Sequence, residues 1–143
     1  MQLATLSTRA QIGIVAPAVR VEVHLSSGLP QIAIVGLPES AVRESKDRVR
    51  SAILNSLFDF PLSRITVNLA PADLPKDGGG RYDLPIALGI LGASGQIGRD
   101  ALEGFEFIGE LALNGDIRPV YGALPAALAC HEAGRTLVLP AAK

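Results

Sequence analysis

One stretch of the chain joins a buried strand, a glycine loop and a helix, a layout in which many proteins hold a phosphate or a nucleophile. The apolar run around Val67 ends at a loop with three consecutive glycines, and an apolar helix is predicted to open at Asp83. In such a loop the backbone can approach a ligand closely, and the helix terminus offers N–H groups without partners. The loop supplies the candidate contact surface, formed by Lys76, Asp77, Gly78, Gly79, Gly80, Arg81 and Asp83.

Phosphate chemistry is the first possibility for this loop. A nucleoside-triphosphatase loop needs Lys and then Ser or Thr after its glycines, to reach the phosphates and the magnesium. Here Arg81-Tyr82-Asp83 follows instead, which excludes such a site in this stretch. Simple anion binding through Lys76, Arg81 and free N–H groups stays open. The sequence favours Asp83 as the helix N-cap, because its carboxylate would occupy those N–H groups and repel a phosphate.

Nucleophilic catalysis needs a hydroxyl or thiol beside a base. Neither His24 nor His131 is near a glycine-flanked serine in sequence, and His24 falls on the polar side of a predicted strand as an ordinary surface residue. Cys130 is the only cysteine, so no internal disulfide is possible, and we expect it to be a small buried residue of a helix. No set of metal-ligating residues at metal-site spacing is evident.

Composition indicates a globular chain. It has 143 residues, 48% of them hydrophobic and 19% charged, with a formal net charge of -1, which excludes a disordered chain and a generic polyanion binder. The N-terminus does not look like a signal peptide, and no apolar run approaches the roughly 20 residues of a membrane span. We therefore expect one soluble, cytoplasmic domain over residues 1–143, without a membrane partner.

Periodicity predicts a mixed α/β sheet with helices packed on it. The expected strands cover residues 8–15, 19–25, 31–35, 63–69, 105–111 and 136–140, the third more buried than the second. Helices are expected from 36–40 to about 56, from 83 onward and over 122–133. Asn114-Gly115 predicts a hairpin that returns through 117–119.

The first long helix has two contrasting faces. A stripe of apolar residues, Val42, Val49, Ile53 and Leu57, is predicted to pack on the sheet. The opposite face carries the candidate DNA contacts Arg43, Lys46 and Arg50, because cations there would neutralise phosphates. The alternative is a solvated face with i,i+4 ion pairs from Glu39 to Arg43 and from Glu44 to Arg48, and the interspersed acids favour it.

The stretch over residues 68–87 resembles the signature of the N-terminal domain of magnesium-chelatase-like AAA+ ATPases, the ComM and YifB family. Supporting segments lie at 21–24, 36–39, 47–53 and 109–113, so the resemblance covers nearly the whole chain in order. One departure is Gly80, a third glycine where relatives commonly have two.

The resemblance implies the fold of the Lon protease catalytic domain, which belongs with the second domain of small-subunit ribosomal protein five. The catalytic serine of Lon-type proteases falls on Gly80 and the lysine on Leu124, so both members of the dyad are missing. Longer relatives add an ATPase module with ATP and magnesium, form rings and are linked to DNA branch migration in natural transformation. For this chain the resemblance implies no cofactor and a non-catalytic assembly or substrate-guiding role with the ATPase module and neighbouring subunits. Direct DNA binding and a residual hydrolase are the alternatives.

Overall fold

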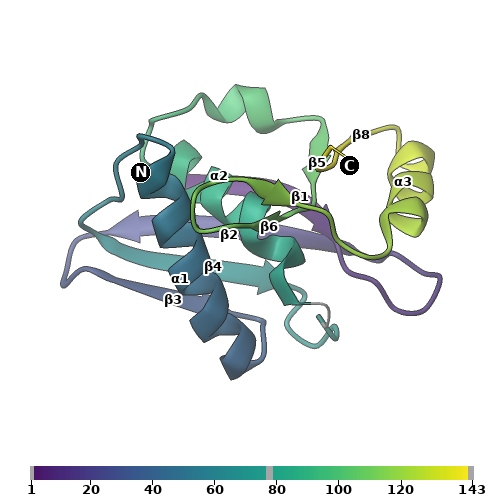
Figure 1. The fold of residues 1–143 in the computed structure, drawn as a ribbon, viewed down its shortest axis with the longest axis horizontal. Helices are drawn as coiled ribbons and strands as arrows, with labels where there is room; N and C mark the ends of the chain where they lie inside the picture. The colour runs from purple at the N-terminus through teal and green to yellow at the C-terminus, as the bar shows by residue number, and fades with distance from the viewer. Residues whose placement is uncertain (1, 77–78, 142–143) are drawn as a thin grey trace.

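A computed structural model describes residues 2–76 and 79–141. It contains a six-stranded mixed sheet in the order β3-β4-β2-β1-β5-β8, with helices packed on it (Figure 1). The sheet strands are β1 Gln2–Arg9, β2 Ala18–Ser26, β3 Gln31–Val35, β4 Arg64–Ala70, β5 Phe105–Phe107 and β8 Thr136–Val138. A separate hairpin pairs β6 Glu110–Leu111 with β7 Ile117–Arg118. The α-helices are α1 Glu39–Asn55, α2 Asp83–Ala93 and α3 Ala123–Glu132. Two short 3-10 helices are η1 Gly79–Tyr82 and η2 Arg99–Leu102. The predicted fold class is confirmed.

The main core lies between one face of the sheet and the helices α1 and α2. In β2 every second residue from Val19 to Leu25 is buried, as the alternation in sequence predicts. Helix α2 is buried on almost every side, because it lies between the sheet and α1. Gly89 permits this close approach, since a Cβ atom there would lie 2.5 Å from Cγ2 of Val23.

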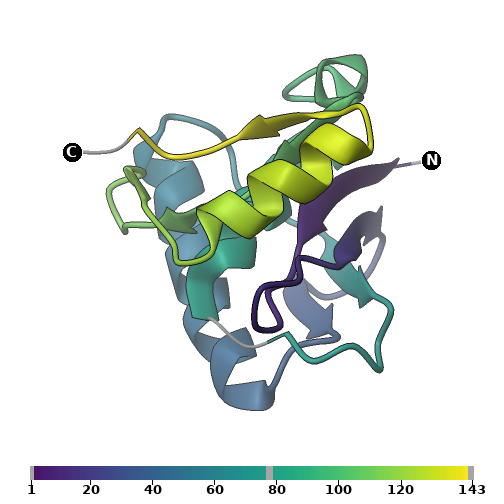
Figure 2. The same ribbon diagram turned by 90° about the vertical axis from the view of Figure 1, so that its right-hand side faces the viewer.

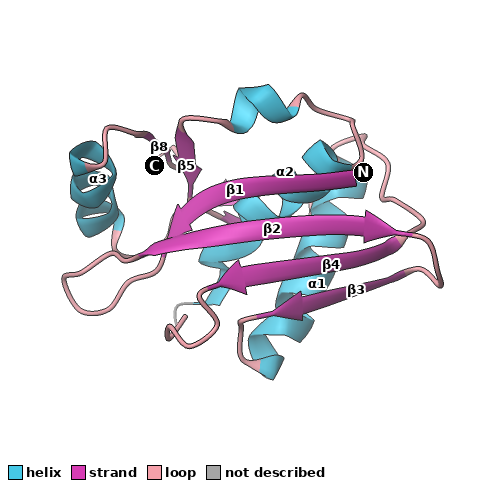
Figure 3. Ribbon diagram, turned by 180° about the vertical axis from the view of Figure 1, so that it is seen from behind, coloured by secondary structure: helices cyan, strands magenta, loops and turns pink. Residues whose placement is uncertain are grey.

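The other face of the strands β3, β4, β2 and β1 is not covered by α1 or α2 (Figure 3). Helix α3 lies at the end of the molecule beside β8, and Ala126 on its inner side forms a small second core with Ile108 and Ala16. The β1–β2 connection, residues 10–17, therefore lies against α3 at this end.

The first and third predicted strands differ from the structure. The strand expected over 8–15 is wrong in its bounds, because the alternation of buried Ala4 and Leu6 places β1 earlier. Residues 10–17 form the connection instead, where Ile12 and Val15 exchange backbone hydrogen bonds of 2.8 and 2.9 Å. The strand expected to be more buried, β3, is an edge strand in which only Ile34 is buried, because it has a neighbour on one side alone.

Four other local expectations are corrected or refined. Helix α1 ends at Asn55, and Leu57 points to solvent with a positive φ of 67°, so it does not extend the apolar stripe. The strand expected over 105–111 is divided between β5 and β6, which belong to different sheets. The strand expected over 136–140 ends at Val138. The hairpin is confirmed, but residues 112–116 join its strands, with the Gly115 N–H donating to the carbonyl oxygen of Ala112 at 3.0 Å and Gly115 at a positive φ of 99°.

Candidate functional site

Lys76, expected to be exposed on the glycine loop, is buried and only 3% accessible. Its ammonium donates hydrogen bonds to the carbonyl oxygens of Pro71 and Leu74, the latter at 3.0 Å. Burial lowers the pKa of Lys76. The side chain thus closes the turn after β4. Asp77 and Gly78, the next two residues of the predicted contact surface, lie outside the described residues, and Gly79 opens η1.

Arg81 was also expected to be exposed, and it is 2% accessible. Its Nε donates to the carbonyl oxygen of Arg9 at 3.0 Å, and its Nη1 donates to that of Tyr121 at 2.9 Å. Burial lowers the pKa of the guanidinium. Arg81 therefore connects the glycine loop both to the end of β1 and to the segment just before α3, because its fork of donors reaches carbonyl groups of two separate elements.

Asp83 does not cap α2 as predicted. It is the first residue of the helix, and its buried carboxylate accepts hydrogen bonds from Ser45 Oγ at 2.7 Å and from Arg48 Nε at 2.6 Å, both on α1. The backbone N–H of Leu111 in β6 donates to it at 3.1 Å. Burial raises the pKa of the Asp83 carboxyl, against the opposing effect of these donors.

This carboxylate joins three elements: α1, α2 and β6. Arg48 pairs with Asp83 through its guanidinium, although the sequence predicted an i,i+4 pair with Glu44 on the surface of α1. The hydrogen bond with Asp83 raises the pKa of the Arg48 guanidinium above its ordinary value. The end of the glycine loop is thus fixed by a buried polar cluster with a structural role.

Gly80 and Leu124 are the residues that the resemblance predicts at the two dyad positions. A Cβ atom on Gly80 would lie 2.4 Å from Oε1 of Glu110, so the space that a serine side chain needs is filled by this carboxylate. Leu124 lies in the first turn of α3 with its side chain 70% accessible. Neither residue has a group that could attack a carbonyl or accept a proton.

We expect that restoring the dyad residues does not restore proteolysis. In the double variant Gly80→Ser with Leu124→Lys, the serine hydroxyl would compete with Glu110 for the same space. Hydrolysis of a fluorescent casein should stay at the level of the unsubstituted chain. A rate increase that disappears when the serine is changed to alanine would show instead that the scaffold retains a working active-site geometry.

The candidate DNA contacts lie along one side of α1. Arg43 and Arg50 are exposed and Lys46 is half-buried. The Arg50 guanidinium lies over the ring of Phe60, 5.7 Å from its centroid. Acidic residues of the same helix surround these cations. Contact with DNA through Arg43, Lys46 and Arg50 stays a prediction.

Two smaller expectations are confirmed: His24 is exposed on the open face of the sheet, and Cys130 is buried in α3. Burial and the nearby Glu106 carboxylate raise the pKa of the Cys130 thiol. In the part of the chain that the structure describes, no three His, Cys, Asp or Glu residues gather as a metal site would require. No helix among the described residues has the length and apolar character needed to cross a membrane.

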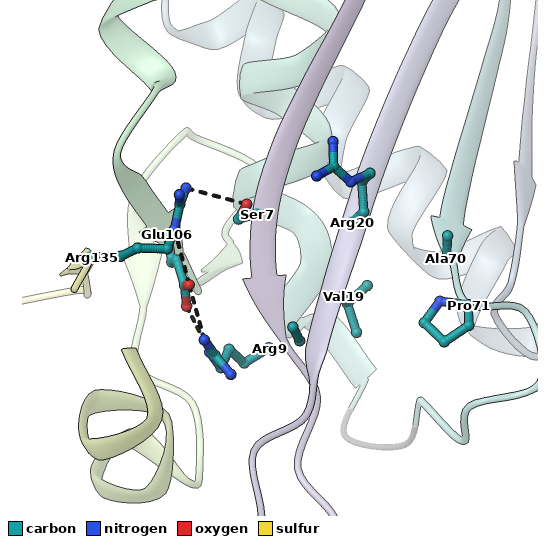
Figure 4. A pocket seen from close by; sticks show the side chains of 9 residues that line it. Ser7, Arg9, Val19, Arg20, Ala70, Pro71, Glu106 and Arg135 are labelled. Carbon is teal, nitrogen blue, oxygen red and sulfur yellow. Dashed lines mark hydrogen bonds and ion pairs between the residues drawn. The ribbon is translucent and has the colours of Figure 1, made fainter. Parts of the chain in front are cut away.

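Sequence patterns did not point to a second polar cluster, on the open face of the sheet. Arg9 and Arg135 both approach the buried carboxylate of Glu106, and Arg20 lies nearby (Figure 4). Arg9 and Arg20 come from β1 and β2, whereas Glu106 in β5 lies 97 positions after Arg9 and Arg135 immediately precedes β8. The alternation of β2 placed Arg20 on the polar face, but no local pattern could show which residues of β1 and β5 lie beside it.

Comparison with known proteins assigns the class. A family model described as subunit ChlI of Mg-chelatase matches residues 21–143. The chain therefore belongs to this magnesium-chelatase-like family, as the signature over 68–87 predicted.

Individual relatives make the assignment more specific. The competence protein ComM of Haemophilus influenzae is 55% identical over 139 residues, which are 97% of this chain and 27% of that protein. The uncharacterized protein YifB of Escherichia coli is 52% identical over the same shares. A Lon protease of Chloroflexus aurantiacus is 30% identical over 129 residues, 84% of this chain and 15% of the protease. The chain spans about a quarter of the length of the ComM and YifB relatives.

Proposed function

We propose that the chain is the N-terminal domain of a ComM-like protein and serves as a non-catalytic assembly or substrate-guiding element. The similarity to ComM over nearly the whole chain supports the parent class. In the longer relatives an ATPase module with ATP and magnesium would follow this domain, in a ring that moves DNA branches during transformation. The partners of the domain would then be that module and its neighbours in the ring.

The observation that carries the assembly role is an apolar surface at the end of the molecule where the dyad lysine would lie. On α3, Leu124 and Leu128 are one turn apart and both point to solvent, and Tyr121 just before the helix is 91% accessible. The β1–β2 connection adds three more exposed apolar residues. We call this set the α3 face: Ile12, Ile14, Val15, Tyr121, Leu124 and Leu128.

The two parts of the α3 face lie together. Figures 1 and 2 place residues 10–17 and α3 at the same end of the molecule. A Cβ atom on Gly122 would lie 2.2 Å from Oε1 of Gln11, so the connection touches the start of the helix. Contiguous exposed apolar surface is typical of protein–protein interaction sites, because water contact with it is unfavourable. We infer that a neighbouring subunit covers it.

The full-length protein that carries this domain provides the test. Replacing Tyr121 and Leu124 by Asp places charges in the α3 face and should weaken self-association at least about tenfold, since each buried apolar side chain contributes about 1.5–3 kcal/mol. Sedimentation velocity with ATP over a concentration series would measure this. The control is Leu62→Asp, because Leu62 is an equally exposed apolar residue far from α3. Unchanged assembly of the double variant would contradict the proposal.

A further inference from the structure

The open face of the sheet carries a pocket of about 500 Å³ where β4, β2, β1 and β5 lie side by side (Figure 4). The strand register explains its position: Arg20 is paired with Ser7 on one side and with Ala70 on the other, and Ser7 is paired with Glu106. Paired residues point to the same side of a sheet, so these four form one row across it. The small side chains of Ser7 and Ala70 leave the row hollow.

Three guanidinium groups surround this hollow, and two of them share one carboxylate. Arg9 makes a bidentate contact with Glu106, at 2.8 Å from Nε and 3.1 Å from Nη2, and its Nη1 donates to the carbonyl oxygen of Ala16. Arg135 Nε lies 3.1 Å from the same carboxylate, and its Nη2 donates to Ser7 Oγ at 3.3 Å and to the carbonyl oxygen of Phe105 at 3.0 Å. Arg9 and Arg135 are therefore fixed in place before any ligand arrives.

Arg20 differs from the other two arginines. It is exposed, leans over the row toward β1 in Figure 4, and makes no ion pair or side-chain hydrogen bond with any residue that the structure describes. With Glu106 as the single carboxylate among the lining residues, three arginines give the pocket a formal charge of +2. The chain as a whole has a formal net charge of -1, so the positive charge of the pocket is a local feature of this face.

We propose that this pocket binds a phosphate group. A tetrahedral anion seated over Ser7 would accept hydrogen bonds from Arg20, from the Ser7 hydroxyl and from Nη1 of Arg135, since Nε and Nη2 of Arg135 already contact Glu106, Ser7 and Phe105. Guanidinium forks match phosphate oxygens in geometry, and their hydrogen bonds to anions are about twice as strong as neutral ones. A formal charge of +2 suits a phosphate better than a single carboxylate. The inference concerns a different face from the α3 face and does not rest on the proposed assembly role.

The phosphate could come from a nucleic-acid backbone or from a free nucleotide, and three probes separate these sources. Inorganic phosphate and a nucleoside monophosphate are titrated into the chain by calorimetry, and a labelled oligodeoxythymidine is titrated by fluorescence anisotropy at low and high salt. Binding of the oligonucleotide alone would assign the backbone, because only a strand adds contacts along the open face. Comparable binding of all three would assign the phosphate group itself. Either result supports the site, and no binding of any probe at millimolar concentration overturns it.

Substitutions localise the binding. Arg20→Gln should weaken binding of the probe about tenfold, the loss expected for one charge-assisted contact. The chain should stay folded, since the Arg20 side chain makes no hydrogen bond or ion pair with the residues that the structure describes. The control is Arg64→Gln, which removes one positive charge from the same open face of the sheet. Arg64 is six residues before Ala70 on β4, so at about 3.3 Å per residue it lies about 20 Å from the pocket. Equal weakening by the two variants would mean diffuse attraction to the sheet, and it would overturn the site.

Discussion

Replacement of Asp83 by Ala is expected to lower the free energy of unfolding by about 3–5 kcal/mol, the usual effect of removing one partner from a buried ion pair. The substitution leaves the Arg48 guanidinium, the Ser45 hydroxyl and the Leu111 N–H without their acceptor in the interior. Each of those groups then stays buried without the hydrogen bond that offsets the free-energy cost of its desolvation. Urea denaturation followed by circular dichroism would measure the change.

Two further variants make the Asp83 experiment specific. Asp47→Ala removes an exposed carboxylate from α1, the helix of Ser45 and Arg48, and should change the free energy of unfolding by less than about 0.5 kcal/mol. Replacing both partners, Arg48→Met with Asp83→Leu, should recover much of the lost stability, because an apolar pair needs no compensation for buried charge. If Asp83→Ala unfolds at the same urea concentration as the unsubstituted chain, the carboxylate does not hold α1, α2 and β6 together.

The second large effect is expected at Glu106, which is 2% accessible between Arg9 and Arg135. Glu106→Gln keeps the shape of the side chain but leaves two guanidinium groups facing each other without a counter-charge. We expect a loss of about 2–4 kcal/mol in the free energy of unfolding. Because β5 joins β1 at the single paired position Ser7–Glu106, the loss should first loosen β5, β8 and α3.

Hydrogen exchange would locate the effect of Glu106→Gln. Amides of β5, β8 and α3 should exchange faster than those of β2 and β4, which are paired along their whole length. The matched control is Glu132→Gln on the exposed side of α3, which should leave both stability and exchange unchanged. Uniform acceleration across all strands would mean that the Arg9–Glu106–Arg135 cluster has no special relation to this part of the fold.

Local patterns predicted much of the fold. The alternation in β2, the apolar stripe of α1 and the uniform apolar run of α2 each correspond to an element with nearly the expected bounds. These local patterns failed where the burial of an element depends on its neighbours in the fold. β3 looked buried because its residues are apolar, and only its place at the edge of the sheet exposes them.

The candidate site was harder to predict for the same reason. Lys76 and Arg81 look like surface residues in a polar loop. Their burial depends on backbone carbonyl oxygens that accept their hydrogen bonds, and the one that Arg81 Nε reaches, on Arg9, is 72 positions away in sequence. Asp83 stands where a cap is common, but Ser45 and Arg48 reach it from another helix. The family signature predicted the positions of the dyad, and that prediction stays open; only the coordinates show Glu110 beside Gly80.

We propose that this protease-like scaffold serves assembly, and sedimentation velocity of the full-length protein with and without residues 1–143 tests the proposal most directly. With ATP present, the intact protein should sediment as a ring, and the truncated protein should dissociate to smaller species at the same concentration. Rings of unchanged size and stability after removal of the domain would contradict the account.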